Sequence, residues 1–177
     1  MATTEQDLAD AGITIVSGRD DHGPGLMALI EPIFAEYEGV LFFLDEMPEL
    51  ECAATTFQRD SGQFWCAFRG ERLIGCCGYT PTADGGGVEL KKLYVARDER
   101  RHKLGHVLTY RVEEAGRAGG KGFVELWSDV KFTAAHRFYE ARGYQRDGRT
   151  RELHDKSDTV EFYFRLSLEP PPQREHG

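Results

Sequence analysis

The stretch that decides the fold is Val88 to Val95, VELKKLYV, followed closely by the basic run Arg100 to Gly105, RRHKLG. The first segment predicts a strand, and apolar residues recur at helical spacing after Gly105. The basic run therefore lies in a turn between a strand and the N-terminus of a helix. Unpaired backbone N–H groups, the helix dipole and a glycine that permits close approach make such a turn a candidate anion site.

A second informative segment runs from Phe132 to Tyr144, FTAAHRFYEARGY. It predicts a short helix that begins at a cap near Thr133 and is stopped by Gly143. This helix carries Tyr139. The first segment alone is a weak signal, but the two segments in this order and at this spacing make a fairly specific one.

Together these segments resemble the GNAT family of N-acetyltransferases, which transfer an acetyl group from acetyl-CoA to an amine. The family's phosphate loop reads Arg or Gln, two residues, Gly, one residue, and Gly or Ala. Arg100 and Gly105 fit this pattern, whereas Lys103 replaces the middle glycine. The family's second segment is matched by Ala135, Phe138, Tyr139, Glu140, Gly143 and Tyr144, with Phe132 in place of an asparagine. Arg97 is a further departure, because a proline often stands there.

The resemblance covers about residues 13–168 and implies an α/β (α+β) fold, in which about four helices flank a mixed, largely antiparallel central sheet of about seven strands. Sequence periodicity predicts the same class. Strands are predicted at 13–18, 64–69, 73–80, 88–95, 123–128, 144–153 and 159–166, and helices around 23–37, 50–57, 105–118 and 133–143. Residues 1–12 are predicted to be a disordered leader, 13–168 a single domain, and 169–177 a flexible Pro-rich tail.

Composition predicts one cytoplasmic domain. The chain of 177 residues is long enough for one good core. It has no apolar run approaching the ~20 residues of a membrane span, and its start lacks the features of a signal peptide. The cysteines, Cys52, Cys66, Cys76 and Cys77, form no CxxC pair. We interpret them as small core residues, with a reactive thiol as the alternative, and expect neither a disulfide framework nor a metal.

The distribution of charge is more informative than the net charge of −8, which argues against nucleic acid as a partner. Residues 20–58 contain nine acidic residues and no Lys or Arg, whereas 21 basic residues face 18 acidic ones from Arg59 onward. One end of the molecule thus suits a cation and another suits phosphate. Solvated acidic helices explain the first feature equally well.

Acetyl transfer to an amine needs a neutral nitrogen, and an alkylammonium has a pKa of about 10.4, so a base must be near it. The leaving thiolate needs a proton. The resemblance places Tyr139 beside the CoA sulfur as proton donor, although Phe138 and Tyr139 also suit an aromatic core pair. Glu89 stands where the histone-acetyltransferase branch carries its general base, and a surface ion pair with a lysine is the alternative. Period-2 alternation predicts that Glu89 and Lys91 share a face with Leu93 and Val95.

The resemblance also assigns binding residues. Those expected to hold acetyl-CoA are Leu93, Tyr94 and Val95 along the pantetheine arm, and Arg100, Arg101, His102, Lys103, Leu104, Gly105 and His106 around the phosphates. Asp45 and Glu46, in the acidic segment, are candidates for the acceptor site. Trp127 and Asp129 are candidates too, because they end the strand beside the expected opening of the sheet.

The sequence therefore predicts an N-acetyltransferase that moves acetyl directly from acetyl-CoA to a primary amine, either a small molecule or an amino acid. The alternative is a non-catalytic sensor or scaffold domain that binds CoA, and the altered Lys103 and Phe132 positions keep it open. No nucleic acid, membrane or metal is expected, and a homodimer is a reasonable prior.

Overall fold

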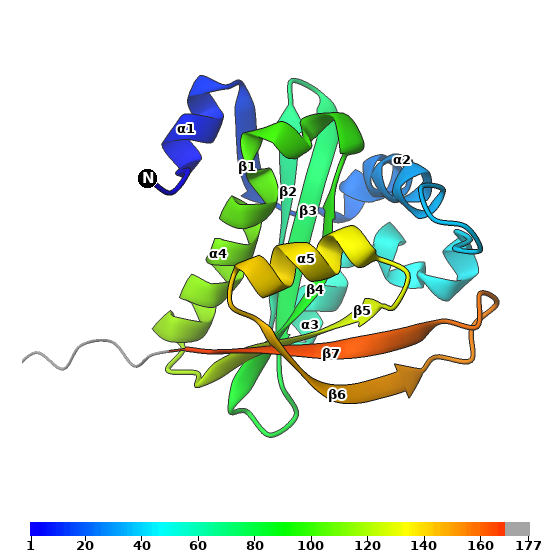
Figure 1. The fold of residues 1–177 in the computed structure, drawn as a ribbon. Coiled ribbons are helices and arrows are strands. Elements are labelled where there is room, and N and C mark those ends of the chain that lie inside the picture. The colour runs from blue at the N-terminus through cyan, green and yellow to red at the C-terminus, as the bar shows by residue number, and fades with distance from the viewer. Residues whose placement is uncertain (169–177) are drawn as a thin grey trace, which may run out of the picture.

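The computed structural model describes residues 1–168, which form one seven-stranded sheet flanked by helices (Figure 1). The strands are β1 (Ile13–Ser17), β2 (Gln63–Arg69), β3 (Arg72–Pro81), β4 (Gly87–Val95), β5 (Phe123–Asp129), β6 (Gln145–Glu152) and β7 (Val160–Ser167). Their order across the sheet is β1-β2-β3-β4-β5-β7-β6. All neighbouring strands are antiparallel except β4 and β5. The predicted fold class is confirmed.

The helices cover both faces of the sheet. The α-helices are α1 (Glu5–Asp10), α2 (Gly23–Phe34), α3 (Ala53–Arg59), α4 (Leu104–Ala118) and α5 (Thr133–Ala141), and 3-10 turns are η1 (Asp20–His22), η2 (Leu44–Glu46), η3 (Pro48–Glu51) and η4 (Arg97–His102). In Figure 1, α4 and α5 cross one face, while α2 and α3 lie behind it. The helix α4 buries Leu104, Leu108 and Val112 of its apolar stripe, together with Val107. No helix within residues 1–168 is long and apolar enough to cross a membrane.

The first twelve residues differ from the prediction of a disordered leader, because they contain the helix α1. Thr4 and Asp7 form a capping box, in which each side chain accepts from the other residue's backbone N–H. Leu8 is 1% exposed and joins the core, and Arg111 of α4 pairs with Glu5 at 2.6 Å. A capped turn with one buried leucine is too short a signal to stand out in a polar segment. The predicted tail, residues 169–177, lies outside the described residues.

Three of the four cysteines are core residues, as predicted. Cys66, Cys76 and Cys77 are fully buried in β2 and β3, and burial raises the pKa of the Cys66 thiol to about 12. Such thiols are unreactive at neutral pH. The prediction is wrong for Cys52, which is exposed at the start of α3.

The strand β4 carries a bulge that the sequence does not reveal. Lys92 has a φ of 57°, in the left-handed region, and the register with β3 shifts between Cys76 and Gly78. The Cys76 thiol donates to the Lys92 carbonyl across 3.1 Å. Strict alternation along β4 is therefore wrong beyond Lys91, because an extra residue resets which side chains share a face.

The sheet opens between β4 and β5. These strands are in register only at Gly87 with Phe123, Val88 with Val124, and Glu89 with Glu125. Beyond Glu89, β4 stays paired with β3 and β5 stays paired with β7, so the two central strands separate. This separation exposes backbone groups of β4 in the middle of the molecule.

Candidate active site

A cleft of about 260 Å³ lies where β4 leaves β5. It is mostly apolar and is bounded by β4, the basic turn, α5 and the end of α2. Its lining residues are Ile33, Tyr37, Leu93, Tyr94, Val95, Arg100, Lys103, Gly105, His106, Phe132, Ala134, Ala135, Phe138 and Tyr139. The structure thus brings the predicted strand residues, part of the predicted basic turn and the predicted tyrosine to one cavity.

The basic turn ends in a helix N-terminus with free donors. The amides of His106 and Val107 bond to the Lys103 carbonyl. Within residues 1–168, the amides of Leu104 and Gly105 have no acceptor. Two free N–H groups at the positive end of a helix dipole are suited to an anion such as a phosphate group.

Lys103, which replaces the family's glycine, adopts the conformation that glycine favours. Its φ is 57° and its ψ is 27°, so the left-handed turn into α4 is kept without a glycine. The side chain is exposed at the edge of the cleft. The substitution therefore preserves the backbone path and adds a positive charge beside the free amides.

The fold does not require a glycine at position 105. A Cβ placed there would lie 3.6 Å from Phe138 and 3.8 Å from Val95, which are ordinary contacts. We expect Gly105→Ala to keep or slightly raise the free energy of unfolding, by about 0.5–1 kcal/mol, because alanine favours a helix. The added methyl should weaken CoA binding by filling the approach to the amides. Urea unfolding and calorimetry with CoA measure the two effects, and a loss of stability would contradict this view of Gly105.

Arg100 lines the cleft but already has partners. Its guanidinium makes two hydrogen bonds to the Glu36 carboxylate, at 2.8 and 2.9 Å, and Nε donates to the Val95 carbonyl at 3.2 Å. Arg100 therefore joins the basic turn to the segment after α2. The resemblance predicts Arg100 as a phosphate ligand, and nothing in the sequence links it to Glu36, which is 64 positions away.

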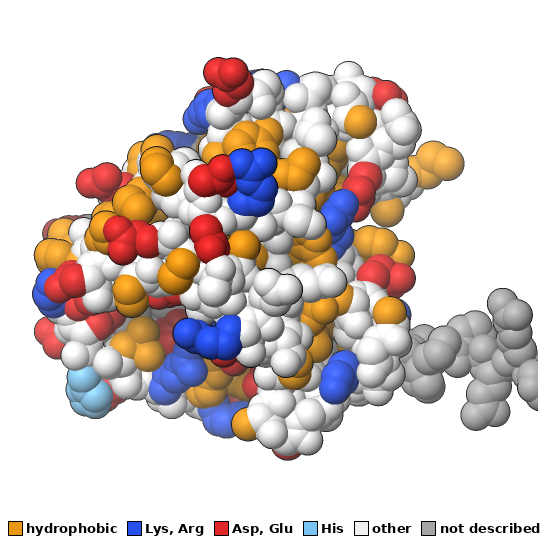
Figure 2. Space-filling view, turned by 180° about the vertical axis from the view of Figure 1, so that it is seen from behind, with side chains coloured by type: hydrophobic (Ala, Val, Ile, Leu, Met, Phe, Trp, Pro, Cys, Tyr) orange, Lys and Arg blue, Asp and Glu red, His pale blue; other side chains and the backbone are white. Residues whose placement is uncertain are grey.

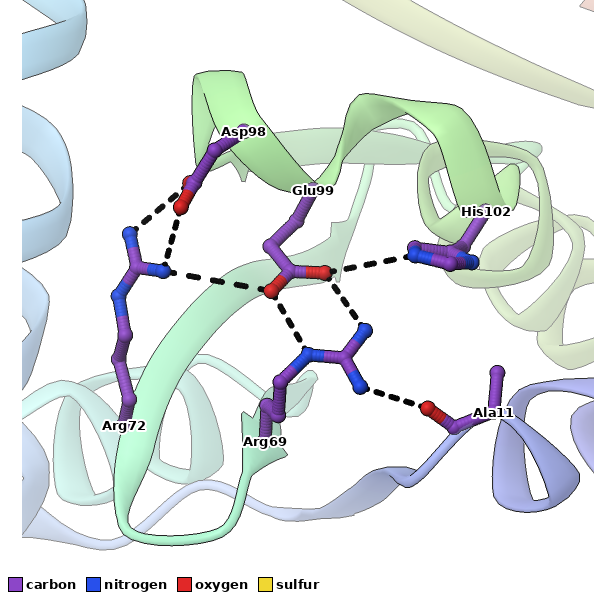
Figure 3. Close-up of polar contacts among 6 residues, drawn as sticks. All are labelled: Ala11, Arg69, Arg72, Asp98, Glu99 and His102. Carbon is purple, nitrogen blue, oxygen red and sulfur yellow. Dashed lines mark hydrogen bonds and ion pairs between the residues drawn. The ribbon is translucent and has the colours of Figure 1, made fainter.

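The opposite side of the same turn is held by arginines from the β2–β3 hairpin (Figure 3). Arg69 makes two hydrogen bonds to Glu99, each of 2.8 Å, and Arg72 makes two to Asp98. The Glu99 side chain is buried, and its acidity is increased because Arg69 lowers its pKa. His102 lies 3.9 Å from Glu99. These ion pairs fix the turn, while Arg101 and His102 remain exposed at its surface.

Tyr139 is 5% exposed and is packed by Phe138, Tyr144 and Phe164. It is both an aromatic core residue and part of the cleft wall. Its hydroxyl has no hydrogen-bond partner among the described residues. Every unpaired side-chain oxygen in this part of the chain keeps some exposed surface, and so the Tyr139 oxygen does too. The hydroxyl therefore reaches the cleft. Burial raises the pKa of Tyr139, so its proton stays in place at neutral pH.

Glu89 is the last β4 residue in register with β5, at the point where the sheet opens. It is half-buried, and burial raises its pKa. The positive charges of Lys91, 3.8 Å away, and of Arg151 oppose this rise in the pKa, whereas the nearby carboxylates of Glu125 and Glu161 add to it. A carboxylate with a raised pKa is a better proton acceptor than an exposed one. The raised pKa fits the interpretation of Glu89 as a general base, and the nearby Lys91 fits the interpretation as an ion pair.

Two of the predicted acceptor residues end β5. Trp127 lies under Arg151, whose guanidinium carbon is 4.4 Å from the ring centre, and beside Tyr163. The Asp129 carboxylate accepts from the Lys131 backbone at 2.9 Å. Asp129 is buried and shapes the turn into α5.

The other two, Asp45 and Glu46, lie in the loop between α2 and α3 and contact the β6–β7 turn. Lys156 pairs with Asp45 at 2.6 Å, and its backbone N–H donates to Glu46 at 2.7 Å. Lys156 lowers the pKa of Asp45. Seen from behind, acidic side chains gather over α2 and the loop that follows it (Figure 2).

Sequence reasoning missed several residues of the site. The cleft is lined by Ile33 in the last turn of α2, by Tyr37 just after that helix, and by Phe132, which packs on Phe34 and Tyr37. The replacement of asparagine by Phe132 thus contributes an aromatic wall to the cleft. The four-residue spacing of Ile33 and Tyr37 could have indicated that they share a face. The same spacing is typical of any helix face that packs on a core, so it does not distinguish a cleft from a core.

Comparison with known proteins agrees with this geometry. A model of the acetyltransferase (GNAT) family matches residues 27–144. The chain belongs to this family. A curated Xenopus tropicalis relative described as probable N-acetyltransferase 14 is 29% identical over 124 residues, which are 69% of this chain and 60% of the relative. The chain therefore spans about 60% of the length of the curated relative it matches.

Solved structures show the same fold. A GNAT-family acetyltransferase from Staphylococcus aureus Mu50 has a TM-score of 0.73 at 23% identity, covering 89% of this chain and 99% of that one. A Salmonella typhimurium protein, solved with its cofactor acetyl-CoA, has a TM-score of 0.68 at 14% identity, covering 94% of this chain and 99% of that one. At these identities the likeness establishes the fold.

Proposed function

We propose that the protein is an N-acetyltransferase that transfers acetyl from acetyl-CoA directly to a primary amine of a small molecule or amino acid. The observation that carries this proposal is the cleft itself, which is lined by Gly105, at the helix N-terminus with the two free amides, and by Tyr139, whose hydroxyl reaches it. Family membership supports the same activity.

The residues of the cleft fit acetyl-CoA. The free amides of Leu104 and Gly105, with the Lys103 charge beside them, suit a phosphate group. The apolar wall of Leu93, Val95 and Phe138 suits a thin, flexible arm, and the open edge of β4 offers backbone groups to its amides. When bound, acetyl-CoA supplies the activated acetyl thioester.

The side chains then divide the proton transfers. Tyr139 holds a proton at its phenol oxygen and can donate it to sulfur as negative charge develops there. Glu89, with its raised pKa, can accept the amine proton directly or through water. No covalent nucleophile is required, and burial keeps Cys66, Cys76 and Cys77 from acting as one.

The acceptor is proposed to be cationic before it reacts. The acidic surface over α2 and the following loop would attract an ammonium group. Asp45 and Glu46 contribute to this field even though Lys156 partly compensates them. We favour a small amine over a lysine of a protein as the acceptor, because we recognise no motif in the sequence for docking a protein substrate.

A thiol-release assay with acetyl-CoA and a panel of amines, amino acids and lysine peptides tests this function. We expect CoA release that depends on at least one small amine, with mass spectrometry showing the acetylated product. CoA binding without turnover across the panel would favour the sensor alternative. Preference for acidic acceptors would contradict the proposed steering.

A further inference from the structure

A buried ion pair joins Glu113, in the third turn of α4, to Arg142, the residue that follows α5. Glu113 of α4 is 4% exposed and accepts from Arg142 at 2.7 and 3.3 Å, and from the Tyr144 hydroxyl at 3.2 Å. The same guanidinium reaches His106, with Nη1 3.0 Å from Nδ1. Arg142 thus bridges a buried carboxylate and a histidine of the cleft wall.

This contact fixes the tautomer of His106. An arginine guanidinium has donors and no acceptors, so the Nδ1 of His106 must accept and cannot carry a proton. The ring proton therefore resides on Nε2. Burial and the neighbouring Arg142 and Lys103 lower the pKa of His106, while Glu113 opposes them, so the ring stays neutral at physiological pH.

The Nε2–H group is available to a ligand. His106 lines the cleft in the same helical turn as the free amides of Leu104 and Gly105, and its ring lies against Phe138 at 4.6 Å between centroids. Within residues 1–168, Nε2 has no hydrogen-bond partner and is not fully enclosed.

We propose that Glu113 and Arg142 position His106 so that its Nε2–H donates to a phosphate oxygen of the cofactor, beside the amides of the phosphate turn. The inference rests on the proposed function. His106 is then a binding residue, and Glu113 and Arg142 are positioning residues that act through it. Arg142 follows directly after α5, which carries Tyr139, so the same contact ties the phosphate turn to the helix of the proton donor.

The tautomer and the contact can be read by NMR of the imidazole nitrogens, with His106 assigned by its loss in His106→Gln. We expect the Nε2–H form in the free protein and a change at Nε2 on saturation with CoA. His22 is a matched control, because its Nδ1 also accepts, from the Arg19 backbone at 3.1 Å, and its ring also stacks, on Phe68. His22 should show the same tautomer and no response to CoA. An Nδ1–H form at His106, or an unchanged Nε2 signal with CoA bound, would overturn the proposal.

Two amide variants separate binding from a purely structural role. His106→Gln retains a donor near the position of Nε2, whereas His106→Asn retains an acceptor for Arg142 and loses the distal N–H. We expect calorimetry to show about tenfold weaker CoA binding for His106→Asn and less than about threefold for His106→Gln, since hydrogen bonds to charged groups are strong. The KM for acetyl-CoA should rise in parallel with little change in kcat.

The reverse order, with His106→Gln the more damaged variant, would mean that His106 serves only to hold Arg142. Equal affinities for all three proteins would also reject the proposed contact. Failure of the unaltered protein to bind CoA at all would instead refute the proposed function, so the two failures are distinguishable.

Discussion

Replacing Tyr139 with phenylalanine should lower kcat by about 10²–10⁴-fold, the usual range for a general acid, while the KM for acetyl-CoA changes little. The hydroxyl reaches the cleft without a partner among the described residues, so its removal leaves no buried group unsatisfied. Its contribution arises only as sulfur gains charge in the transition state. Steady-state kinetics with the preferred amine measures the effect.

The ring should keep its contacts with Phe138, Tyr144 and Phe164 in this variant, and thermal unfolding serves as the control for folding. A loss smaller than tenfold would show that water protonates the sulfur unaided. That outcome would remove Tyr139 from the mechanism and leave the cofactor assignment intact.

Glu89→Gln should lower kcat/KM at neutral pH by about 10²-fold or more if Glu89 is the base. A carboxylate accepts a proton only when it is ionised, and burial raises the pKa of Glu89. The rate of the unaltered enzyme should therefore fall as the pH drops through a pKa above the ordinary glutamate range. The variant must rely on amine that is already neutral, so its deficit should shrink as the pH rises toward the amine pKa of about 10.4.

Glu125 offers a matched control, because it lies opposite Glu89 in the β4–β5 register and accepts from the Tyr163 hydroxyl at 2.8 Å. Glu125→Gln keeps a carbonyl oxygen for that hydrogen bond and removes the same charge. Equal losses in both variants would indicate a general electrostatic effect of the acidic cluster. A pH-independent deficit in Glu89→Gln would also exclude a base at this position.

The fold was predictable because its strands and helices have clear hydrophobic periodicity and are bounded by turn residues. The strand before the basic turn, the amphipathic α4 and the short helix with Tyr139 each follow from spacing and turn residues. The features that were missed depend on a few atoms. The helix α1 depends on one capping box and one buried leucine. The β4 bulge depends on a left-handed backbone conformation at Lys92, which a lysine in a strand does not predict.

The positions of the site's backbone groups could be predicted from the sequence, but the ion-pair and hydrogen-bond partners of its charged side chains could not. The free amides and Tyr139 follow from where a helix starts and where a motif places a tyrosine. The partners of Arg100, Asp45 and His106 come from elements far away in the sequence, namely Glu36, Lys156 and Arg142. Local patterns carry no information about such pairs, so an arginine that looks free for phosphate is in fact shared with a carboxylate.

The arginine at the end of β2 makes the N-terminal residues relevant to cofactor binding. Arg69 donates to the Ala11 carbonyl at 2.6 Å and, with its other nitrogens, holds Glu99 beneath the basic turn (Figure 3). A chain shortened to the limits of the family match, or only to residue 13, would remove the carbonyl that anchors this guanidinium. We expect shortened versions to have a more mobile basic turn and to bind CoA more weakly than the whole protein does.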